Sequence, residues 1–167
     1  HPPCGGNIGQ GELISPDIRM NIYYGLHTYP GPGIYTISML DPNRNEGIIN
    51  MDDSYNTPFF VETTLLIGSS SMGLDTNSSP VLLIPPLDNA CTGKLFVHNP
   101  GAYDPNGDSL SYQLVDCMQS NGMVISGFNT PSDVSINPIT GDLVWDVPPA
   151  IINTNLGEDE YNVCFEI

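Results

Sequence analysis

The longest strand signal in the chain is Phe59-Phe60-Val61-Glu62-Thr63-Thr64-Leu65-Leu66-Ile67. β-Branched and aromatic residues dominate this run, and both favour the half-buried surface of a sheet. Pro58 stands at its start, where a missing backbone N–H is tolerated. A shorter run of the same character, Ile34-Tyr35-Thr36-Ile37-Ser38-Met39, comes earlier. The two stretches predict two strands of a sheet.

Other short apolar or alternating runs, each bounded by Gly, Pro, Asn or Asp, predict further strands. They are residues 19–26, 81–84, 95–98, 109–116, 123–128, 134–136, 142–147 and 161–167. Helical periodicity is absent, and 17 glycines with 16 prolines supply the turns. Turn signals about every ten residues are typical of a β-sandwich. The sequence therefore predicts an all-β fold.

A Gly/Ser-rich stretch separates two strand-rich halves of the chain. Residues 69–79 have the composition of a linker, with small and polar residues throughout. We therefore expect one module over residues 1–68 and a second over residues 80–167. A long surface loop within a single domain is the alternative, and the sequence leaves it open.

The charge of the chain is almost purely negative. Three Lys and Arg stand against 19 Asp and Glu, which gives a formal net charge of −16. So few cations cannot neutralise a phosphate backbone or an anionic membrane surface, which argues against nucleic acid and membrane partners. No run approaches the roughly 20 apolar residues of a membrane span. The balance favours cations, Ca²⁺ in particular, because this hard ion takes oxygen ligands.

The four cysteines are widely spaced and form no CxxC pair: Cys4, Cys91, Cys117 and Cys164. This usage indicates an oxidising compartment and up to two disulfides. Four cysteines allow three connectivities, which sequence alone does not separate. We favour Cys91–Cys117, because both lie at predicted strand edges of one module. Its loop of about 25 residues would contribute on the order of 3 kcal/mol. The other two cysteines, Cys4 and Cys164, would then form a second disulfide or remain as two unpaired thiols.

The strongest local motif is Ala102-Tyr103-Asp104-Pro105-Asn106-Gly107-Asp108-Ser109-Leu110-Ser111-Tyr112-Gln113-Leu114. Asp104, Asn106 and Asp108 present side-chain oxygens at alternate positions, a pattern suited to Ca²⁺. The motif is not an EF-hand, since the glycine comes too early and a strand follows. A turn closed by its own Asp side chain, without metal, is the alternative. We predict a calcium site at these three residues.

This motif resembles the DPDGDxLxY signature of cadherin-like and related bacterial Ig-like repeats. Downstream, Val134-Ser135-Ile136-Asn137-Pro138-Ile139-Thr140-Gly141-Asp142-Leu143-Val144-Trp145 is similar to their second hallmark, a D-x-x-T-G-x-L-x-W hairpin. Asn137 replaces the usual aspartate, which weakens the expectation of a metal ligand there. We expect Gly141 to adopt a positive φ in the turn and Trp145 to anchor the core.

The first half carries a second resemblance. His27-Thr28-Tyr29-Pro30-Gly31-Pro32-Gly33-Ile34-Tyr35-Thr36-Ile37 is similar to the H-x-Y-x-x-P-G-x-Y-x-V strand of PKD-like domains. The W-D-F-G-D-G segment that precedes this strand in PKD domains is missing. The two resemblances imply tandem Ig-like or cadherin-like β-sandwich modules, with the first module partial or divergent.

The combination of motifs resembles large cell-surface proteins of Bacteroidota that are exported by type IX secretion. This resemblance implies an extracellular or cell-surface location and a multidomain parent. We expect the native polypeptide to continue beyond Ile167, because the last residues form a strand with no turn after it. The expected partners are neighbouring modules of the same polypeptide, other copies of it, or surface glycans and proteins.

Three function classes follow. The first is a non-enzymatic structural or adhesive module, calcium-stabilised, which serves as a stalk or filament segment. Open strands at its ends would allow completion by a neighbouring copy through β-augmentation. The second is a carbohydrate-binding accessory domain of a secreted hydrolase, for which tyrosines are available: Tyr23, Tyr24, Tyr29, Tyr35 and Tyr55. The third, an enzyme, is disfavoured, because no nucleophile elbow, HExxH helix or phosphate loop is present. Each of the three histidines also has a structural explanation.

Overall fold

A computed structural model describes residues 11–15, 18–69, 75–152 and 157–167 of the chain. The chain forms two compact units, His1–Gly31 and Pro32–Ile167. The described part is all-β, with several small antiparallel sheets and short 3₁₀ turns at Ser54–Asn56 (η1) and Ser120–Gly122 (η3). The predicted fold class is confirmed at this level.

The first unit contains one small antiparallel pair. Strand β1 (Glu12–Ser15) pairs with β2 (Ile18–Met20), and the register shifts between Leu13 and Ser15. Arg19 donates from Nη1 to the carbonyl oxygen of Gly11 at 3.0 Å. Strand β2 ends at Met20, so the strand predicted over residues 19–26 is shorter than expected, and residues 21–26 are exposed.

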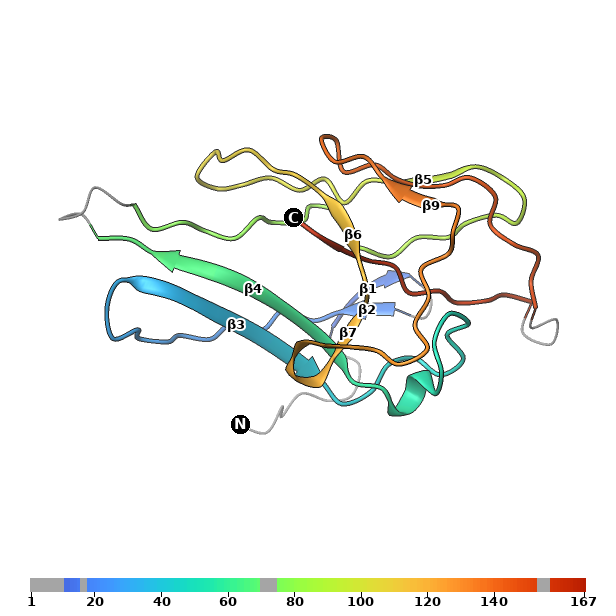
Figure 1. Ribbon diagram of the computed structural model, residues 1–167, viewed down its shortest axis with the longest axis horizontal. Coiled ribbons are helices and arrows are strands. Elements are labelled where there is room, and N and C mark those ends of the chain that lie inside the picture. The colour runs from blue at the N-terminus through green and yellow to red at the C-terminus, as the bar shows by residue number, and fades with distance from the viewer. Residues whose placement is uncertain (1–10, 16–17, 70–74, 153–156) are drawn as a thin grey trace. The chain divides into compact units, whose positions relative to one another are not determined.

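The longest pairing lies at the start of the second unit (Figure 1). Strands β3 (Gly33–Asp41) and β4 (Phe59–Ile67) run antiparallel through nine paired positions, with Ile37 opposite Thr63. Both predicted strands are confirmed, and β4 begins directly after Pro58, as expected. Strand β4 is half-buried along much of its length, whereas β3 is largely exposed.

The predicted hairpin over residues 134–145 supplies two strands of a three-stranded sheet, with its second strand in the centre. Strand β10 (Leu143–Trp145) pairs with β9 (Val134–Ile136) on one side and β5 (Phe96–His98) on the other. Trp145 is only 7% exposed and packs with Val134 and Leu143, so its predicted role as a core anchor is confirmed.

Two smaller pairs complete the second unit. Strand β6 (Gln113–Val115) pairs with β11 (Cys164–Glu166), and β7 (Met118–Gln119) pairs with β8 (Met123–Val124) across η3. Several strands are shorter than predicted. Residues 81–84 form an isolated bridge between Val81 and Tyr103 instead of a strand, and Leu83 and Ile84 both donate their backbone N–H groups to the carbonyl oxygen of Pro100, at 3.2 and 3.0 Å.

The disulfide joins Cys117 to Cys164, with 5.2 Å between their Cα atoms. The favoured Cys91–Cys117 pairing is wrong, and so is Cys4–Cys164. Pairing of β6 with β11 sets Cys164 opposite Val115, which brings Cys164 next to Cys117 just beyond the ladder. Cys91 is an exposed free thiol, and Cys4 lies outside the described residues. The spacing of the cysteines along the chain therefore predicted the wrong disulfide, because sheet pairing decides which cysteines meet.

The disulfide lies in a second small core, formed by Ile48, Met51, Cys117, Ile125 and Phe128. This core draws on residues from both sides of the Gly/Ser-rich stretch. The predicted boundary at residues 69–79 stays a prediction, and residues 70–74 of it lie outside the described residues. Within the described part of the chain, no helix has the length and hydropathy needed to cross a bilayer.

Candidate functional site: an acidic turn at residues 104–108

The acidic turn follows the bridge between Val81 and Tyr103, which fixes its entry by two backbone hydrogen bonds of 2.9 and 3.0 Å. Asp104 closes the turn. Its Oδ1 accepts the backbone N–H groups of Asn106 at 2.7 Å and Asp108 at 3.2 Å, and its carbonyl oxygen accepts from Gly107. Gly107 has φ +85°, which a residue with a Cβ rarely adopts. The sequence thus builds a tight loop in which one carboxylate oxygen of Asp104 accepts hydrogen bonds from two of the next four residues.

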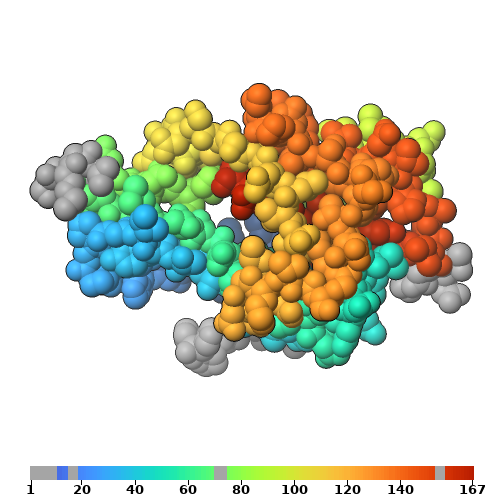
Figure 2. Space-filling view, in the orientation of Figure 1, coloured from blue at the N-terminus to red at the C-terminus, as the bar shows by residue number. Residues whose placement is uncertain are grey.

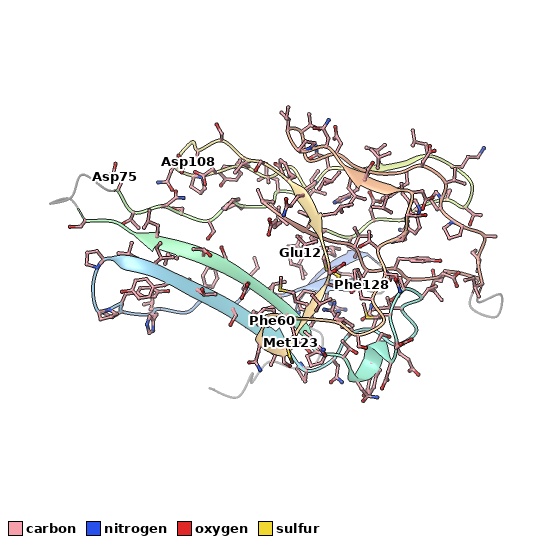
Figure 3. The ribbon with its side chains drawn as sticks, viewed as in Figure 1. Glu12, Phe60, Asp75, Asp108, Met123 and Phe128 are labelled. Atoms are coloured by element: carbon pink, nitrogen blue, oxygen red, sulfur yellow. A yellow bond between two sulfur atoms is a disulfide. The ribbon has the colours of Figure 1, made fainter. Side chains whose placement is uncertain are left out.

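A second segment is tied to this turn. Asn106 accepts at Oδ1 from the backbone N–H of Ser78 at 2.7 Å. In Figure 3 the segment that carries Asp75 runs close to the loop that carries Asp108. The neighbouring Asn77 donates its backbone N–H to the carbonyl oxygen of Leu66 at the end of β4, and its side-chain Oδ1 is buried with no hydrogen-bond partner among the residues that the structure describes. The hydrogen bond from Ser78 therefore links the segment at residues 77–78 to the acidic turn.

The residues of the turn fit a Ca²⁺ ion, although two of the three predicted ligands already use a side-chain oxygen in hydrogen bonds. One oxygen of Asp104 and the side-chain oxygen of Asn106 already accept N–H groups. A carboxylate offers about four lone-pair sites, so Asp104 keeps capacity for a cation. No hydrogen bond within the described residues engages the carboxylate of Asp108, and Asn77 adds an orphaned buried oxygen. Since Ca²⁺ takes 6–8 oxygens in irregular geometry, these residues with water could supply a shell.

The three residues predicted from sequence thus lie together in one turn, and the structure adds the contact of Ser78 with Asn106, which the motif did not indicate. Within the described residues, no three His, Cys, Asp or Glu side chains cluster as metal ligands. That result does not bear on a shell built partly from Asn, backbone and water oxygens. Calcium binding stays a prediction.

In the second hallmark turn, at residues 137–142, the side-chain oxygens of Asn137 and Asp142 accept hydrogen bonds from other groups of the protein. Asn137 accepts at Oδ1 from the backbone N–H groups of Ile139 and Thr140, at 2.9 and 3.1 Å. Asp142 accepts from the Thr140 hydroxyl at 2.7 Å and from the Asn99 amide at 2.8 Å. These two hydrogen bonds, that of Thr140 first, hold the pKa of the Asp142 carboxyl below its ordinary value. The turn is a structural clamp between β5 and the β9–β10 hairpin.

Gly141 in this turn has no freedom to change. Its φ is +75°, as expected from the sequence. A Cβ added here would come within 2.8 Å of the ring of Tyr112, which is buried. The close approach explains why a glycine follows Thr140.

Sequence reasoning missed the most connected cation of the chain. Arg44 is 8% exposed and donates from Nη1 to Asn162 Oδ1 at 2.7 Å and from Nη2 to the Met118 carbonyl at 2.8 Å. Its guanidinium also lies 5.0 Å from the ring centre of Phe59. Burial lowers the pKa of Arg44 through desolvation. Its being one of only two arginines in a strongly acidic chain was the signal that could have pointed to it.

An asparagine pair extends this network. Asn50 donates from its amide to the carbonyl oxygens of Asn129 at 3.0 Å and Asn162 at 2.7 Å, and accepts from the Asn162 N–H at 3.0 Å. Three segments far apart in sequence are thereby fixed to one another. We refer to Arg44, Asn50 and Asn162 as the polar staple.

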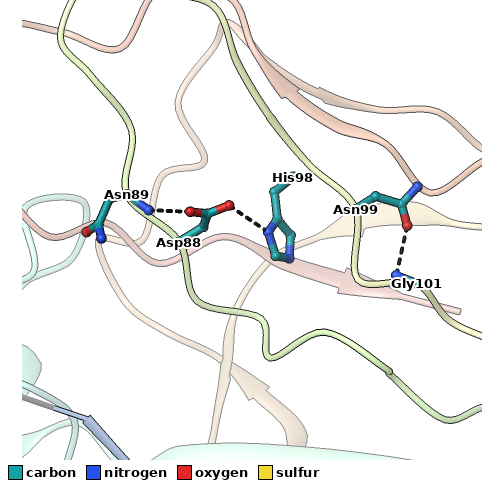
Figure 4. A network of polar contacts seen from close by, with 5 residues as sticks. All are labelled: Asp88, Asn89, His98, Asn99 and Gly101. Carbon is teal, nitrogen blue, oxygen red and sulfur yellow. Dashed lines mark hydrogen bonds and ion pairs between the residues drawn. The ribbon is translucent and has the colours of Figure 1, made fainter. Parts of the chain in front are cut away.

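A second buried polar group is His98 on β5. Its Nδ1 lies 3.3 Å from Oδ2 of Asp88, whose other oxygen accepts the Asn89 N–H at 2.8 Å (Figure 4). Nε2 of His98 is buried and has no partner within the described residues. The contact links β5 to the segment at residues 88–89.

The hollows of the surface are shallow. One of about 430 Å³ lies beside the polar staple, lined by Met39, Asp41, Asn43, Arg44, Asn45, Ile48, Phe59 and Asn162. Another of about 510 Å³ lies over β6 and β7, lined by Leu114, Val115, Asp116, Met118, Val124 and Thr130. Neither brings together a set of catalytic groups. Comparison of the chain with protein-family models, curated proteins and solved structures found no match.

Proposed function

We propose that the chain is a non-enzymatic structural or adhesive module of a large bacterial surface protein. It works outside the cell, as a stalk or filament segment of Ig-like or cadherin-like β-sandwich type with a PKD-like first part. The observation that carries this proposal is that the chain has both a disulfide and a solvent-facing acidic turn. Disulfides persist in oxidising compartments, and millimolar Ca²⁺ occurs outside cells.

The resemblance to Bacteroidota proteins exported by type IX secretion supports the same location. Calcium bound at Asp104, Asn106 and Asp108, with Asn77 as a further donor, would tie the segment at residues 77–78 to the turn. It would also reduce self-repulsion in a chain of net charge −16. A stalk segment benefits from both effects, because each stiffens a surface loop.

Thermal unfolding with and without Ca²⁺ tests the proposal. Extracellular calcium modules have dissociation constants up to about 1 mM, so about 10 mM Ca²⁺ would stabilise by about 1.4 kcal/mol. For a domain of this size that is a rise of about 3–6 °C in Tm. We expect Asp108→Asn to abolish the rise, while Asp146→Asn, an exposed aspartate elsewhere, keeps it. A wild-type Tm that ignores both Ca²⁺ and EDTA would refute the calcium part.

Exposed tyrosines favour a second candidate, a carbohydrate-binding accessory domain of a secreted hydrolase. Tyr23 and Tyr24 in the first unit are 77% and 93% exposed, and Tyr55 in the second is 54% exposed. Exposed aromatic rings provide the flat apolar contact that sugar faces need. A glycan array probed with wild type and with Tyr23→Ala/Tyr24→Ala separates the candidates. Binding that the double variant loses would favour the carbohydrate function, and absence of binding would remove it.

A further inference from the structure

Arg44 carries a buried positive charge that no carboxylate neutralises within the described residues. Its side chain is 8% exposed, and the two groups that accept its hydrogen bonds, Asn162 Oδ1 and the Met118 carbonyl, are both neutral. None of the Asp and Glu side chains in that part of the chain forms an ion pair with it. Charges buried in proteins are usually paired, because burial without a counter-charge is costly. The guanidinium therefore has the electrostatic character of a site for an anion.

The guanidinium also has hydrogen-bond donors to spare. Arginine has five N–H groups in a planar fork, and the two hydrogen bonds engage one N–H on Nη1 and one on Nη2. The second N–H on each of these nitrogens has no acceptor among the described residues. The side chain of Asn162 bonds there only through Oδ1, so its amide N–H groups are free as well. Two neighbouring side chains thus offer donors that a carboxylate can accept.

Arg44 and Asn162 both line the hollow of about 430 Å³ beside the polar staple. Sites for small molecules have volumes of about 300–1,000 Å³. Met39, Asp41 and Phe59 line the same hollow, and they share one face of the β3–β4 pair because Asp41 stands opposite Phe59. In Figure 2 the teal segment that follows β3 lies against the orange segment that includes β7 and β8. The wall of the hollow therefore combines donors, a carboxylate and apolar side chains.

The charges around the hollow select the kind of anion. Asp41 accepts the Asn43 N–H at Oδ1, at 3.2 Å, and its other oxygen has no donor among the described residues. This carboxylate, in a chain of net charge −16, would repel an inorganic dianion. A ligand with one carboxylate and several hydroxyl groups fits better, because its hydroxyls can donate to Asp41. A hexuronic acid, which is a sugar with a carboxylate at C6, has both kinds of group and an apolar ring face.

We propose that this hollow binds a hexuronic acid residue of an acidic glycan. The sugar carboxylate accepts hydrogen bonds from Arg44 and from the Asn162 amide, its hydroxyl groups donate to Asp41, and its ring contacts Met39 and Phe59. The site deepens the proposed adhesive function, on which it rests for its role, by naming the class of ligand. No tyrosine lines the hollow, so the site differs from the one that the carbohydrate-binding candidate uses.

Titration of the full chain with sodium galacturonate in EDTA, followed by nuclear magnetic resonance, tests the site. The Nε–H signal of Arg44 should shift with a dissociation constant of about 1 mM or below. Arg19→Met assigns this signal, because Arg19 is the only other arginine. Galactose lacks the carboxylate and should bind at least about tenfold more weakly. Acetate that binds as tightly as galacturonate overturns the assignment to a sugar, and signals that ignore galacturonate up to about 50 mM overturn the site.

Two neighbouring positions on β3 locate the ligand. The side chains of Met39 and Leu40 are 53% and 55% exposed, but only Met39 lines the hollow. Met39→Glu sets a carboxylate against that of the sugar and should weaken binding at least about tenfold. Leu40→Glu is the matched control, because successive side chains point to opposite faces of a strand, and it should bind within about twofold of wild type. Equal affinities of these two variants overturn the location.

Arg44→Lys tests the contact with the guanidinium itself. Lysine keeps the charge but lacks the fork, so galacturonate should bind at least about tenfold more weakly. Circular dichroism checks that the variant is folded, and the Met39 and Leu40 variants decide the matter if it is not. A folded Arg44→Lys chain with the affinity of wild type overturns the role of Arg44.

The ligand titration and the calcium experiment can fail separately. The titration uses EDTA and reads binding, whereas the calcium experiment reads thermal stability. A chain that ignores calcium and still binds galacturonate refutes the calcium part alone. A chain that gains stability from calcium and binds no galacturonate refutes the hexuronate site alone. Tyr23→Ala/Tyr24→Ala should keep galacturonate binding, and its loss in that variant overturns the placement in the hollow.

Discussion

Replacing Arg44 by methionine tests whether the polar staple holds the second unit together. Methionine has a similar length and keeps apolar packing, but it removes the charge and both hydrogen bonds to Asn162 and Met118. Removal of the guanidinium leaves two carbonyl-type oxygens without their donors. It also removes the contact with the ring of Phe59.

The expected loss follows from opposing contributions. Each hydrogen bond from a charged donor contributes about 1.5–3 kcal/mol, and the cation–π contact adds about 0.5–2. Against these stands the cost of burying the charge, of which the lowered pKa of Arg44 is the sign. The buried Nε without a partner adds to that cost. We therefore expect Arg44→Met to lower the free energy of unfolding by about 2–4 kcal/mol.

Urea unfolding followed by fluorescence of Trp145, the only tryptophan, measures this loss. Arg19→Met is the matched control, because Arg19 is the only other arginine and makes one exposed hydrogen bond in the first unit. It should change stability by no more than about 0.5 kcal/mol. Arg44→Lys keeps the charge but cannot fork, so it should fall between the two. An Arg44→Met chain as stable as the control would show that the staple contributes nothing net.

Three other perturbations have defined outcomes. Gly141→Ala should destabilise by about 1–3 kcal/mol more than Gly107→Ala, because only at Gly141 does the new Cβ also meet an aromatic ring; urea midpoints measure the difference. Cys117→Ser should cost about 4 kcal/mol for a sequence separation of 47, while Cys91→Ser leaves the midpoint unchanged. The folded-state pKa of Asp142 is lowered, so its stabilisation is complete above the unfolded value of about 3.9 and is lost as pH falls through the folded value. Asp142→Asn should therefore make Tm less dependent on pH below about pH 5. If Tm of the variant falls with decreasing pH as steeply as that of wild type, the role of these hydrogen bonds is refuted.

The long strands and the tight hairpin could be predicted from the sequence because their determinants are local. The β-branched run at residues 59–67 and the Thr-Gly turn before Trp145 need only their neighbours to adopt their conformation. Residues 81–84 are equally apolar but extend no sheet beyond the bridge at Val81. Their partner is a distant segment, and alternating apolar residues do not specify which strands meet.

The contacts of the candidate site also divide into local ones, which the sequence predicts, and ones between distant residues, which it does not. The Asp104 turn could be predicted because its oxygens bond to the next few backbone groups. The approach of Ser78 to Asn106, the polar staple and the disulfide join residues 28, 118 and 47 positions apart. Such contacts depend on how the sheets pack. The alternating oxygens of residues 104–108 therefore located the turn from the sequence, while no local pattern pointed to Asn162.

The second unit depends on its cross-links because its apolar cores are small. Within the described residues only nine hydrophobic side chains are buried, and eight of them divide between two separate clusters. A domain of ordinary stability has about 5–15 kcal/mol in total, so a disulfide worth about 4 kcal/mol is a large share. Cys117 is fully buried, which means that a reductant reaches it only after the surrounding core opens. The fold is therefore suited to a compartment where the disulfide stays oxidised.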